Sequence, residues 1–569
     1  MNIQALLHIP DSHYCYPISI NEIVLRLRTD RNDEFDKIEV VYESKYVIYD
    51  KQKIEPLELK YTDDLYSYYE VKLKLKDVRI GYVFLITQKG ERFYFSEDGI
   101  TKEYNFRLAY YNSFQMAYIN KCDVHEIVPW MQQAVFYQIF PDRFYQGNHE
   151  KDCSYITMRW GEIPKAKGFA GGDIKGITKK VDYLKGIGVN AIYLTPIFTS
   201  ISNHKYDISN YKEIDPQFGT KEELRELIEK LHKNGMRIVL DAVFNHSSML
   251  LEEFQDVVKK GKNSKYFDWF IIHGDKVDQE NLNYEVFAFC EYMPKFNTSN
   301  PEVQKYLIDI ATYWIREFDI DGWRLDVSDE VSHVFWRKFR EAVKAEKSDC
   351  VIIGENWHDA NVYLHGDQYD SIMNYAFTKA CLDYYAFESK NANQFEEKLS
   401  KLVMRNTSTV NSMMLNLLDS HDVDRFYTQV KKNKDKMLSA LATTFMYVGV
   451  PCIYYGTELA MEGGYDPDNR RCFDWDENNW DKEYQKCLTK IIALRKMETV
   501  QKGDISFTSK NDLFYLKRKY KDITMILITN ESGEDRPVDI AGEVLISNQY
   551  KENSLLNHGF VVIERKGDL

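Results

Sequence analysis

The middle of this chain alternates short apolar runs with longer stretches of helical period, and this alternation constrains the fold more than any other feature. The runs are rich in branched and aromatic residues and too short for buried helices, so they predict buried strands. Strands that alternate with helices pair in parallel. The predicted strands are VFYQIF (135–140), NAIYLT (190–195), RIVLDAV (237–243), GWRLDV (322–327), CVIIGE (350–355), YDSIMNY (369–375), SMMLNLL (412–418) and CIYYG (452–456). These eight units predict an α/β fold with a closed (β/α)8 TIM barrel.

Segments with a different pattern of apolar and polar residues precede, interrupt and follow this barrel. Short alternating runs such as EIVLRLRT and GYVFLITQ predict an N-terminal β-sandwich over residues 1–124. The barrel is expected over 125–501. A polar and aromatic excursion at about 247–301 is too long for an ordinary loop and predicts a small inserted B subdomain. Strand-like runs return afterwards and predict a C-terminal antiparallel β-sandwich domain over 502–569.

The charge of the chain argues against a polyanionic partner. Its formal net charge is −14, its pI is near 5.5, and it has no dense basic run. Because phosphate binding depends on clustered Lys and Arg, we expect no nucleic-acid partner. The chain does not open with a basic segment followed by an apolar stretch, and it has no apolar run long enough to span a bilayer. We therefore expect no membrane association and a cytoplasmic location, which the nine scattered cysteines fit as reduced thiols.

Ionisable residues gather at the carboxyl ends of several predicted strands. In a barrel of this kind these ends converge on one cleft, where functional groups collect. Carboxylates, histidines and an arginine are therefore expected to face one another there. The segments are Asp241-Ala-Val-Phe-Asn245-His246, Arg324-Leu-Asp326, Glu355-Asn-Trp357 and Ser420-His421-Asp422.

This set of residues suits retaining glycoside hydrolysis. That reaction needs two carboxyl groups about 5 Å apart, one to attack the anomeric carbon and the other to protonate the leaving oxygen. Asp326 suits the nucleophile, because Arg324 two residues earlier points to the same side of the strand and would keep it ionised. Glu355 suits the acid, because burial among carboxylates near Trp357 favours a protonated carboxyl group. Three further side chains are expected to bind hydroxyls of the reacting sugar: Asp422, His421 and His246.

The motifs DAVFNH, GWRLDV, GENW and SHD, with the opening VFYQIFPDRF, resemble the ordered signature regions of the α-amylase family, glycoside hydrolase family 13. A fifth segment, MPKFNTSNPEV, resembles the stretch that marks its neopullulanase, cyclomaltodextrinase and maltogenic amylase group. The resemblance covers essentially the whole chain. It implies an N-terminal sandwich similar to a carbohydrate-binding module. It also implies cleavage of α-1,4 bonds in cyclodextrins, pullulan or maltooligosaccharides, and leaves α-1,6 cleavage and transglycosylation open.

The resemblance implies a role for each matching residue. It makes Asp326 the nucleophile, Glu355 the acid/base and Asp422 the stabiliser of the transition state, in agreement with the assignment from the residues alone. Tyr206 would stack under the reacting glucose. The residues implied in the same subsite are His204, His246, Arg324 and His421. Those implied on the donor side are Asp466 and Arg470, and those implied on the acceptor side are Glu330 and Trp357.

One departure from the family concerns calcium. Relatives carry an Asn-Gly-Asp-x-x-Asn-Asp loop after the first barrel strand, whereas this chain reads Gln-Gly-Asn-His-Glu-Lys-Asp over 146–152. Lys151 thus stands where an oxygen ligand is needed, and calcium takes about six to eight oxygens. We therefore expect no required cofactor and no tight calcium site. A weak site is left open at Asn148, Asp152, Gly171 and Asp173.

The N-terminal sandwich is expected to contribute to assembly. Family resemblance favours a homodimer in which the sandwich of one subunit leans over the barrel mouth of the other, and a twofold contact is the commonest way to form such a pair. A roofed cleft would admit short or cyclic dextrins and exclude long chains.

Two alternative functions differ from this interpretation. An exo-acting α-glucosidase or oligo-1,6-glucosidase is the nearest enzymatic alternative, but such relatives generally lack a sandwich before the barrel. A non-catalytic glycan-binding protein is the other, but it has no need of a nucleophile, its arginine and an acid together. The sequence leaves open which α-glucan is preferred.

Overall fold

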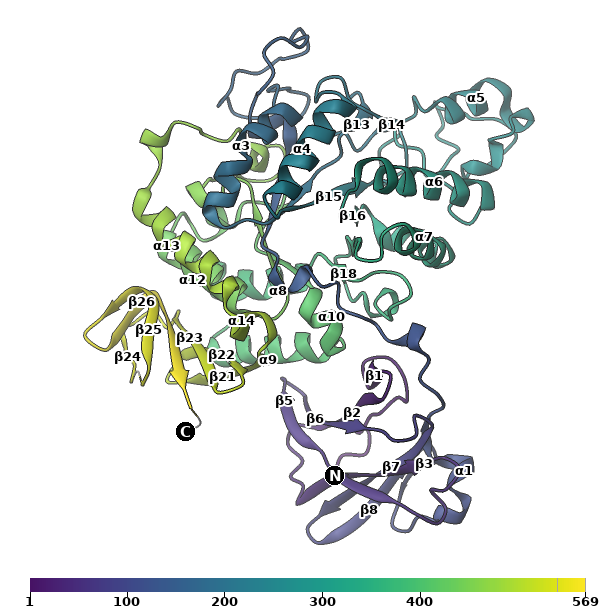
Figure 1. Cartoon of the computed structure of the whole chain (residues 1–569), viewed down its shortest axis with the longest axis vertical. Coiled ribbons are helices and arrows are strands. Elements are labelled where there is room, and N and C mark those ends of the chain that lie inside the picture. Colours follow the sequence, from purple (N-terminus) through teal and green to yellow (C-terminus); the bar gives the residue numbers. More distant parts are fainter. Residues whose placement is uncertain (540, 568–569) are drawn as a thin grey trace.

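The computed structural model describes residues 1–539 and 541–567, and its centre is a barrel of parallel strands (Figure 1). Within these ranges eight strands form one sheet, in the order β18-β17-β16-β15-β12-β11-β20-β19. Their bounds are β11 Phe136–Ile139, β12 Ala191–Leu194, β15 Arg237–Ala242, β16 Gly322–Leu325, β17 Val351–Gly354, β18 Ser371–Ile372, β19 Leu415–Leu417 and β20 Val450–Tyr454. A parallel bridge from Met373 to Leu415 joins the two ends of this order. The predicted TIM barrel is confirmed, and each predicted run overlaps one of its strands, although β20 begins two residues before its predicted run.

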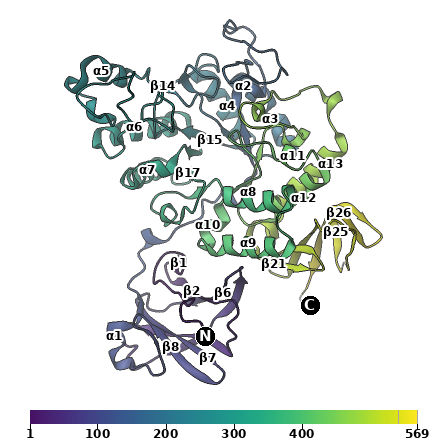
Figure 2. The same cartoon turned by 180° about the vertical axis from the view of Figure 1, so that it is seen from behind.

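Strands that are distant in sequence lie side by side in the barrel. β11 pairs with β12 on one side and with β20 on the other, where Phe136 lies opposite Cys452. Helices cover the outside of the sheet (Figure 2). Their bounds are α2 Pro141–Phe144, α3 Ile174–Ile187, α4 Lys221–Lys233, α6 Pro301–Phe318, α7 His333–Glu346, α8 Tyr375–Cys381, α9 Ala392–Met404, α10 Ser408–Met413, α11 Phe426–Gln429, α12 Lys434–Met446, α13 Lys482–Ala493 and α14 Glu498–Lys502.

Capping residues determine where the helices after the cleft loops begin. The Asp173 carboxylate accepts a hydrogen bond from Gly176 N–H at the start of α3. Thr220 and Glu223 form a reciprocal capping box at the start of α4. Asn300 caps α6, with Pro301 as its first residue. Each of these side chains satisfies backbone N–H groups that the first turn of a helix leaves unpaired, so the loops end at defined positions.

The two-residue period of the strands sorts their side chains onto two faces. Val239 and Ile353 belong to the apolar cluster inside the barrel, whereas Ile238 belongs to the large core that includes the helices. The same period places Asp241 two residues after Val239, and Glu355 two residues after Ile353. These carboxyl groups therefore follow the interior face at the carboxyl end of their strands.

The N-terminal region is a sandwich of two antiparallel sheets, as predicted. One sheet contains β1 Cys15–Ser19, β2 Glu22–Asp30, β6 Tyr66–Lys74 and β5 Glu58–Thr62. The other contains β4 Lys53–Pro56, β3 Lys37–Ser44, β7 Ile80–Gln88, β8 Glu91–Ser96, β9 Gly99–Thr101 and β10 Phe114–Met116, and the short helix α1 Ala109–Asn112 precedes β10. Alternate residues of β2, β3 and β7 form the core between the sheets, including Leu25, Val40 and Phe84.

The sandwich docks on its own barrel through polar contacts. Arg26, whose side chain is buried, donates to Met404 O at 2.9 Å at the end of α9 and pairs with Glu70 at 2.9 Å. Lys401 on α9 pairs with Asp64 at 3.1 Å. In both views the sandwich lies beside α9 and α10, at the end of the molecule opposite α3 and α5 (Figures 1 and 2). The barrel and sandwich therefore form a defined arrangement within one chain.

Two irregular excursions rise above the sheet. The predicted excursion between β15 and α6 contains α5 Glu252–Lys260 and isolated bridges such as Phe270 to Phe296. A hairpin that was not predicted, β13 Phe198–Ser200 with β14 Ile208–Ile214, follows β12. Its connecting loop carries His204 and Tyr206. The hairpin therefore brings two of the predicted site residues to the cleft.

The C-terminal strands are antiparallel, as predicted. They are β21 Asp504–Lys510, β22 Leu513–Tyr520, β23 Ile523–Asn530, β24 Arg536–Pro537, β25 Glu543–Lys551 and β26 Ser554–Lys566, which form one sheet. The exact limits of the domains stay predictions. Among the helices in the described ranges, none is long and apolar enough to cross a bilayer.

Candidate active site

The guanidinium of Arg324, at the end of β16, lies at the centre of a carboxylate cluster. Its Nη1 contacts Asp326 Oδ1 at 2.7 Å and Asp241 Oδ1 at 3.0 Å. Its Nη2 contacts Glu355 Oε2 at 2.9 Å and lies 3.9 Å from Asp422 Oδ2. The barrel register thus brings together carboxyl groups that are far apart in the sequence, around one buried positive charge.

Four carboxyl groups around one arginine leave an excess of negative charge. Burial raises the pKa of Asp241, of Asp326 and of Asp422, the last to about 7, and Arg324 opposes each shift. Because these groups interact strongly, they titrate as a unit. Asp241, Asp326 and Asp422 therefore retain protons closer to neutral pH than isolated carboxylates do.

Glu355 is held by two donors on opposite sides. Val327 N–H donates to Oε2 at 2.9 Å, and the Trp357 indole N–H donates to Oε1 at 3.2 Å. Val327 has φ 44°, a left-handed conformation that costs a branched residue on the order of 1 kcal/mol or more. This strained turn directly follows Asp326. It aims a backbone donor at the second carboxyl group.

Asp326 keeps one oxygen available. Its Oδ1 is bonded to Arg324, while Oδ2 has no hydrogen-bond partner among the residues that the structure describes. His246 Nε2 lies 4.0 Å from that oxygen, and the His246 ring stacks on Phe287 at 4.7 Å. One oxygen of the carboxylate is thus oriented by arginine, and the other can react.

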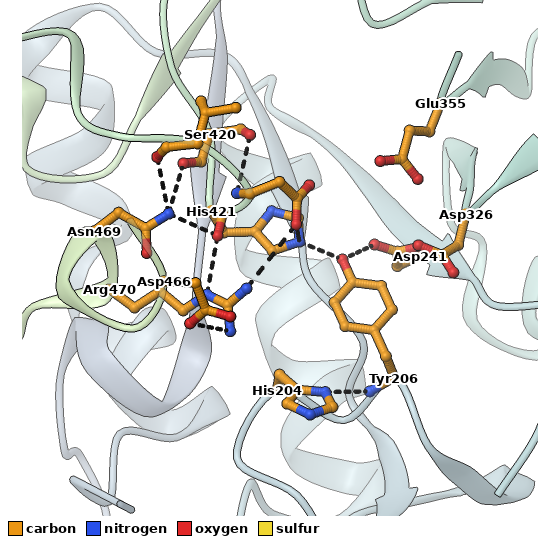
Figure 3. A network of polar contacts seen from close by, with 12 residues as sticks. His204, Tyr206, Asp241, Asp326, Glu355, Ser420, His421, Asp466, Asn469 and Arg470 are labelled. Carbon is orange, nitrogen blue, oxygen red and sulfur yellow. Dashed lines mark hydrogen bonds and ion pairs between the residues drawn. The ribbon is translucent and has the colours of Figure 1, made fainter. Parts of the chain in front are cut away.

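Tyr206 connects the two halves of the site (Figure 3). Its hydroxyl lies 2.9 Å from Asp241 Oδ2 and 2.7 Å from His421 Nε2. The rings of Tyr206 and His421 are parallel, with centroids 5.5 Å apart. His204 lies next to Tyr206, with its Nδ1 3.1 Å from the backbone N of Tyr206. The tyrosine ring is partly exposed and can serve as a platform for a sugar ring.

The histidines of the site are neutral. Burial lowers the pKa of His204 to about 4, that of His246 to about 3 and that of His421 well below its usual value. The Gln138 amide donates to His421 Nδ1 at 2.7 Å, so the proton of the neutral ring lies on Nε2. That nitrogen lies 3.1 Å from Asp422 Oδ1 and can donate to it. Neutral rings of this kind act as fixed hydrogen-bond donors and acceptors.

The predicted donor-side pair lies beside His421 (Figure 3). Arg470 pairs with Asp466 at 3.0 Å and donates from Nε to His421 O at 2.9 Å. Its Nη2 lies 4.0 Å from Asp422 Oδ1. The Asn469 amide also donates to His421 O at 2.8 Å. The loop after β20 therefore contributes a charged wall on this side.

Aromatic residues form another part of the rim. Trp357 stacks on Tyr375 with ring centroids 3.7 Å apart. Glu330 pairs with Lys295 at 2.9 Å, and its side chain is 49% exposed. A cavity of about 400 Å³ opens beside the stacked pair. Its lining includes Trp357, Tyr375, Phe387, Asp422 and Tyr465.

Four residues of the site lie outside the predicted set: Gln138, Tyr193, Phe287 and Tyr375. A fifth, Asp241, was expected at the cleft but was given no role. The sequence indicated a place in the site for Asp241, because this residue opens the motif at the end of a predicted strand. The indication for Gln138 was weaker: it is a polar residue within an apolar run. There was none for Tyr193, which donates to Asp241 at 2.7 Å, or for Tyr375, because only tertiary packing brings them to the carboxylates. In the part of the chain that is described, no group of three or more His, Cys, Asp and Glu side chains could hold a metal ion.

Comparisons with known proteins agree over nearly the whole chain. Residues 138–526 match the family described as alpha amylase, catalytic domain, and residues 1–120 match alpha amylase, N-terminal ig-like domain. A cyclomaltodextrinase of Thermoanaerobacter pseudethanolicus is 42% identical over 539 residues, which cover 94% of this chain and 93% of the relative. An intracellular maltogenic amylase of Bacillus subtilis is 38% identical over 582 residues, with 99% and 98% covered. A solved cyclomaltodextrinase structure matches with a TM-score of 0.91 at 35% identity, with 100% and 98% covered. The chain therefore belongs to the α-amylase family of glycoside hydrolases.

Proposed function

We propose that the protein is a retaining hydrolase of α-glucosidic bonds in cyclodextrins, pullulan or maltooligosaccharides. The observation that carries this proposal is that Arg324 contacts Asp326 and Glu355 through its two terminal nitrogens. Contact of both carboxyl groups with one guanidinium favours a separation of about 5 Å, typical of retaining enzymes, over the wider spacing of inverting enzymes. The substrate class is taken from the names of the relatives.

The reaction follows in two displacements. Asp326 Oδ2 attacks the anomeric carbon while the bond to the leaving oxygen breaks and Glu355 gives that oxygen its proton. Water then attacks the same carbon, Glu355 takes a proton from the water, and the bond to Asp326 breaks. Each step inverts the carbon, so the product keeps the α configuration. Asp422 accepts hydrogen bonds from the sugar hydroxyls, and these bonds tighten as the ring flattens.

The remaining residues form the sugar sites. We assign Tyr206 as the stacking platform under the reacting glucose, with His204, His246 and His421 as neutral hydrogen-bond partners. The donor side is assigned to Asp466 and Arg470. The acceptor side is assigned to Trp357, which stacks on Tyr375, and to Glu330, which pairs with Lys295.

The two alternatives are less well supported. A glycan-binding protein does not require a strained turn and a crowded carboxylate cluster around an arginine, both of which destabilise the fold. An exo-acting α-glucosidase generally has no N-terminal sandwich, whereas this chain has one that matches the N-terminal domain of the family.

The configuration of the first product tests the mechanism. Proton NMR of maltotriose or cyclodextrin hydrolysis, recorded within the first minutes, is expected to show the α-anomer before mutarotation. Early β-anomer would refute the retaining assignment. The Asp326→Ala variant, run in parallel, should release neither anomer.

We also propose a homodimer and a cytoplasmic location. The contacts described above attach the sandwich to α9 rather than to the catalytic cluster of its own chain. The sandwich also exposes 61% of Tyr110 and 82% of Tyr111, and aromatic residues are enriched at interfaces. The cytoplasmic proposal is supported by the nine free cysteines and by the relative named intracellular maltogenic amylase.

A further inference from the structure

The ammonium group of Lys151 is nearly buried and is surrounded by oxygen acceptors. Its Nζ lies 2.7 Å from Gln217 O, 2.9 Å from Gly171 O and 3.0 Å from Asp173 Oδ2, and its side chain is only 8% exposed. An ammonium group has three N–H donors and no acceptor. These three oxygens therefore use its full hydrogen-bonding capacity.

Lys205 repeats the arrangement on the other side of Gln217. Its Nζ lies 2.6 Å from Gln217 Oε1, 2.9 Å from Asp215 Oδ2 and 3.2 Å from Ser200 O. The side chain is 0% exposed. The ammonium is again matched to three acceptors, one of them a carboxylate.

Gln217 joins the two lysines, because its main-chain oxygen accepts from Lys151 and its side-chain oxygen from Lys205. This connection ties the loop at 146–152 to the segment after β14. Lys205 itself stands between His204 and Tyr206, with φ 63°. Hydrogen bonds to the two oxygens of Gln217 thus connect the loop at 146–152 to the loop that carries Tyr206.

The residues around Lys151 do not fit calcium. Asn148 Oδ1 accepts from Glu150 N–H at 3.0 Å, and Asp152 Oδ1 accepts from Ser154 N–H at 2.8 Å, so both stabilise local turns. Asp173 accepts from the backbone N–H groups of Gly147 and Asn148 at 2.9 and 3.0 Å as well as from Lys151. Calcium needs about six to eight oxygen ligands. The Lys151 ammonium already contacts Gly171 O, Gln217 O and Asp173 Oδ2.

We propose that Lys151 and Lys205 are internal cations that share Gln217 and position the loop carrying His204 and Tyr206, and that Lys151 replaces the calcium ion implied by the family. Without either ammonium, a carboxylate with almost no exposure, Asp173 or Asp215, loses its counter-ion, which is strongly destabilising. The positioning role rests on the proposed function, whereas the structural role does not.

Thermal unfolding of four variants tests the structural role. Lys151→Met and Lys205→Met are each expected to lower Tm by several degrees. The double variant should lose less than the sum of the two, because both lysines act on Gln217. Lys179→Met is the matched control: this lysine donates to Gly147 O in the same loop at 2.7 Å, and its loss should change Tm little. If the single variants have the Tm of the wild type, or if their losses of Tm add fully in the double variant, the proposed sharing of Gln217 is wrong.

Kinetics test the positioning role. At a temperature where circular dichroism shows every variant folded, Lys151→Met and Lys205→Met should lower kcat/KM on maltotriose by about tenfold, because the tyrosine platform shifts. Lys179→Met should not. Unchanged kcat/KM in the folded variants overturns positioning. If the Lys205 variant does not fold, Gln217→Met replaces it. This change removes the side-chain amide with its Oε1 acceptor, keeps the main-chain oxygen that Lys151 uses, and should show the same loss. An inactive wild type would instead refute the proposed function and leave the Tm results valid.

Metal removal tests the replacement of calcium. The Tm of the wild type is expected to be the same after EDTA treatment and after addition of CaCl2, and calorimetric titration with CaCl2 should show no binding. A Tm that falls in EDTA and recovers with CaCl2 would show that Lys151 does not replace the ion.

Discussion

At the scale of single residues, two carboxyl groups share one arginine and divide the chemistry. Asp326→Ala and Glu355→Gln are each expected to lower kcat by about 10⁴-fold, because each removes a group that acts in the transition state. Tm should stay close to that of the wild type, since both variants remove charge from a crowded cluster. Initial rates on maltotriose, with Tm as the folding control, check this. Activity within about tenfold of the wild type in either variant would contradict the assignment.

Asp422 is expected to be needed for activity and to lower the stability of the fold as the pH rises. Burial raises its pKa from the ordinary 3.8 to about 7, so between these values the folded state binds a proton that the unfolded state lacks. Its contribution to the free energy of unfolding therefore falls as pH rises through this window. Asp422→Asn removes this titration. Tm of the variant relative to the wild type should rise from about pH 5 to about pH 8, while activity is lost. The side chain is 27% exposed, so the effect should be modest.

A Tm difference between variant and wild type that is constant with pH would show that Asp422 does not titrate in this range. Asp326→Asn is a useful comparison, because burial raises the pKa of that group too. It should show a shift of the same sign.

At the scale of elements, strands were predictable and packing between loops was not. The eight barrel strands follow from branched apolar runs that need burial on both faces, and the residues at their carboxyl ends follow from the two-residue period. The hairpin of β13 and β14 was missed, because β13 has only three residues and β14 interleaves polar and charged residues with its apolar ones. The stack of Trp357 on Tyr375 was also missed, because Trp357 lies in the loop after β17 and Tyr375 begins α8, and only the closed barrel brings the two together.

The capping box of α4 gives a prediction about a helix. Thr220→Ala removes the hydroxyl that accepts from Glu223 N–H and should lower the free energy of unfolding by about 1 kcal/mol. Thr220→Ser keeps a hydroxyl and should lie close to the wild type. Urea unfolding followed by circular dichroism measures both. Equal stabilities for the Ala and Ser variants would show that the cap contributes nothing, and kcat should not change in either.

At the scale of the whole molecule, the proposed dimer makes substrate size depend on assembly. Light scattering is expected to give twice the chain mass at micromolar concentration, and the full chain should prefer cyclodextrin over starch. A chain lacking residues 1–124 should lose this preference if it folds, because no sandwich roofs the cleft. The Tm of the truncated chain, measured alongside, shows whether loss of the Arg26 contacts destabilises the barrel. If the Tm is unchanged, an altered substrate preference is due to the missing sandwich over the cleft. A monomeric full-length chain, or a folded truncated barrel that keeps its preference for cyclodextrin, would contradict the proposal.

The pairing of β11 with β20 has a consequence for biosynthesis. Phe136 lies opposite Cys452, so the first barrel strand waits for a neighbour that leaves the ribosome about 300 residues later. At roughly 5 to 20 residues per second this wait lasts on the order of tens of seconds. The sandwich needs no residue of the barrel for its own sheets and can fold during that time. The nascent barrel, with an apolar strand edge still unpaired, is the stage at which a chaperone is most needed.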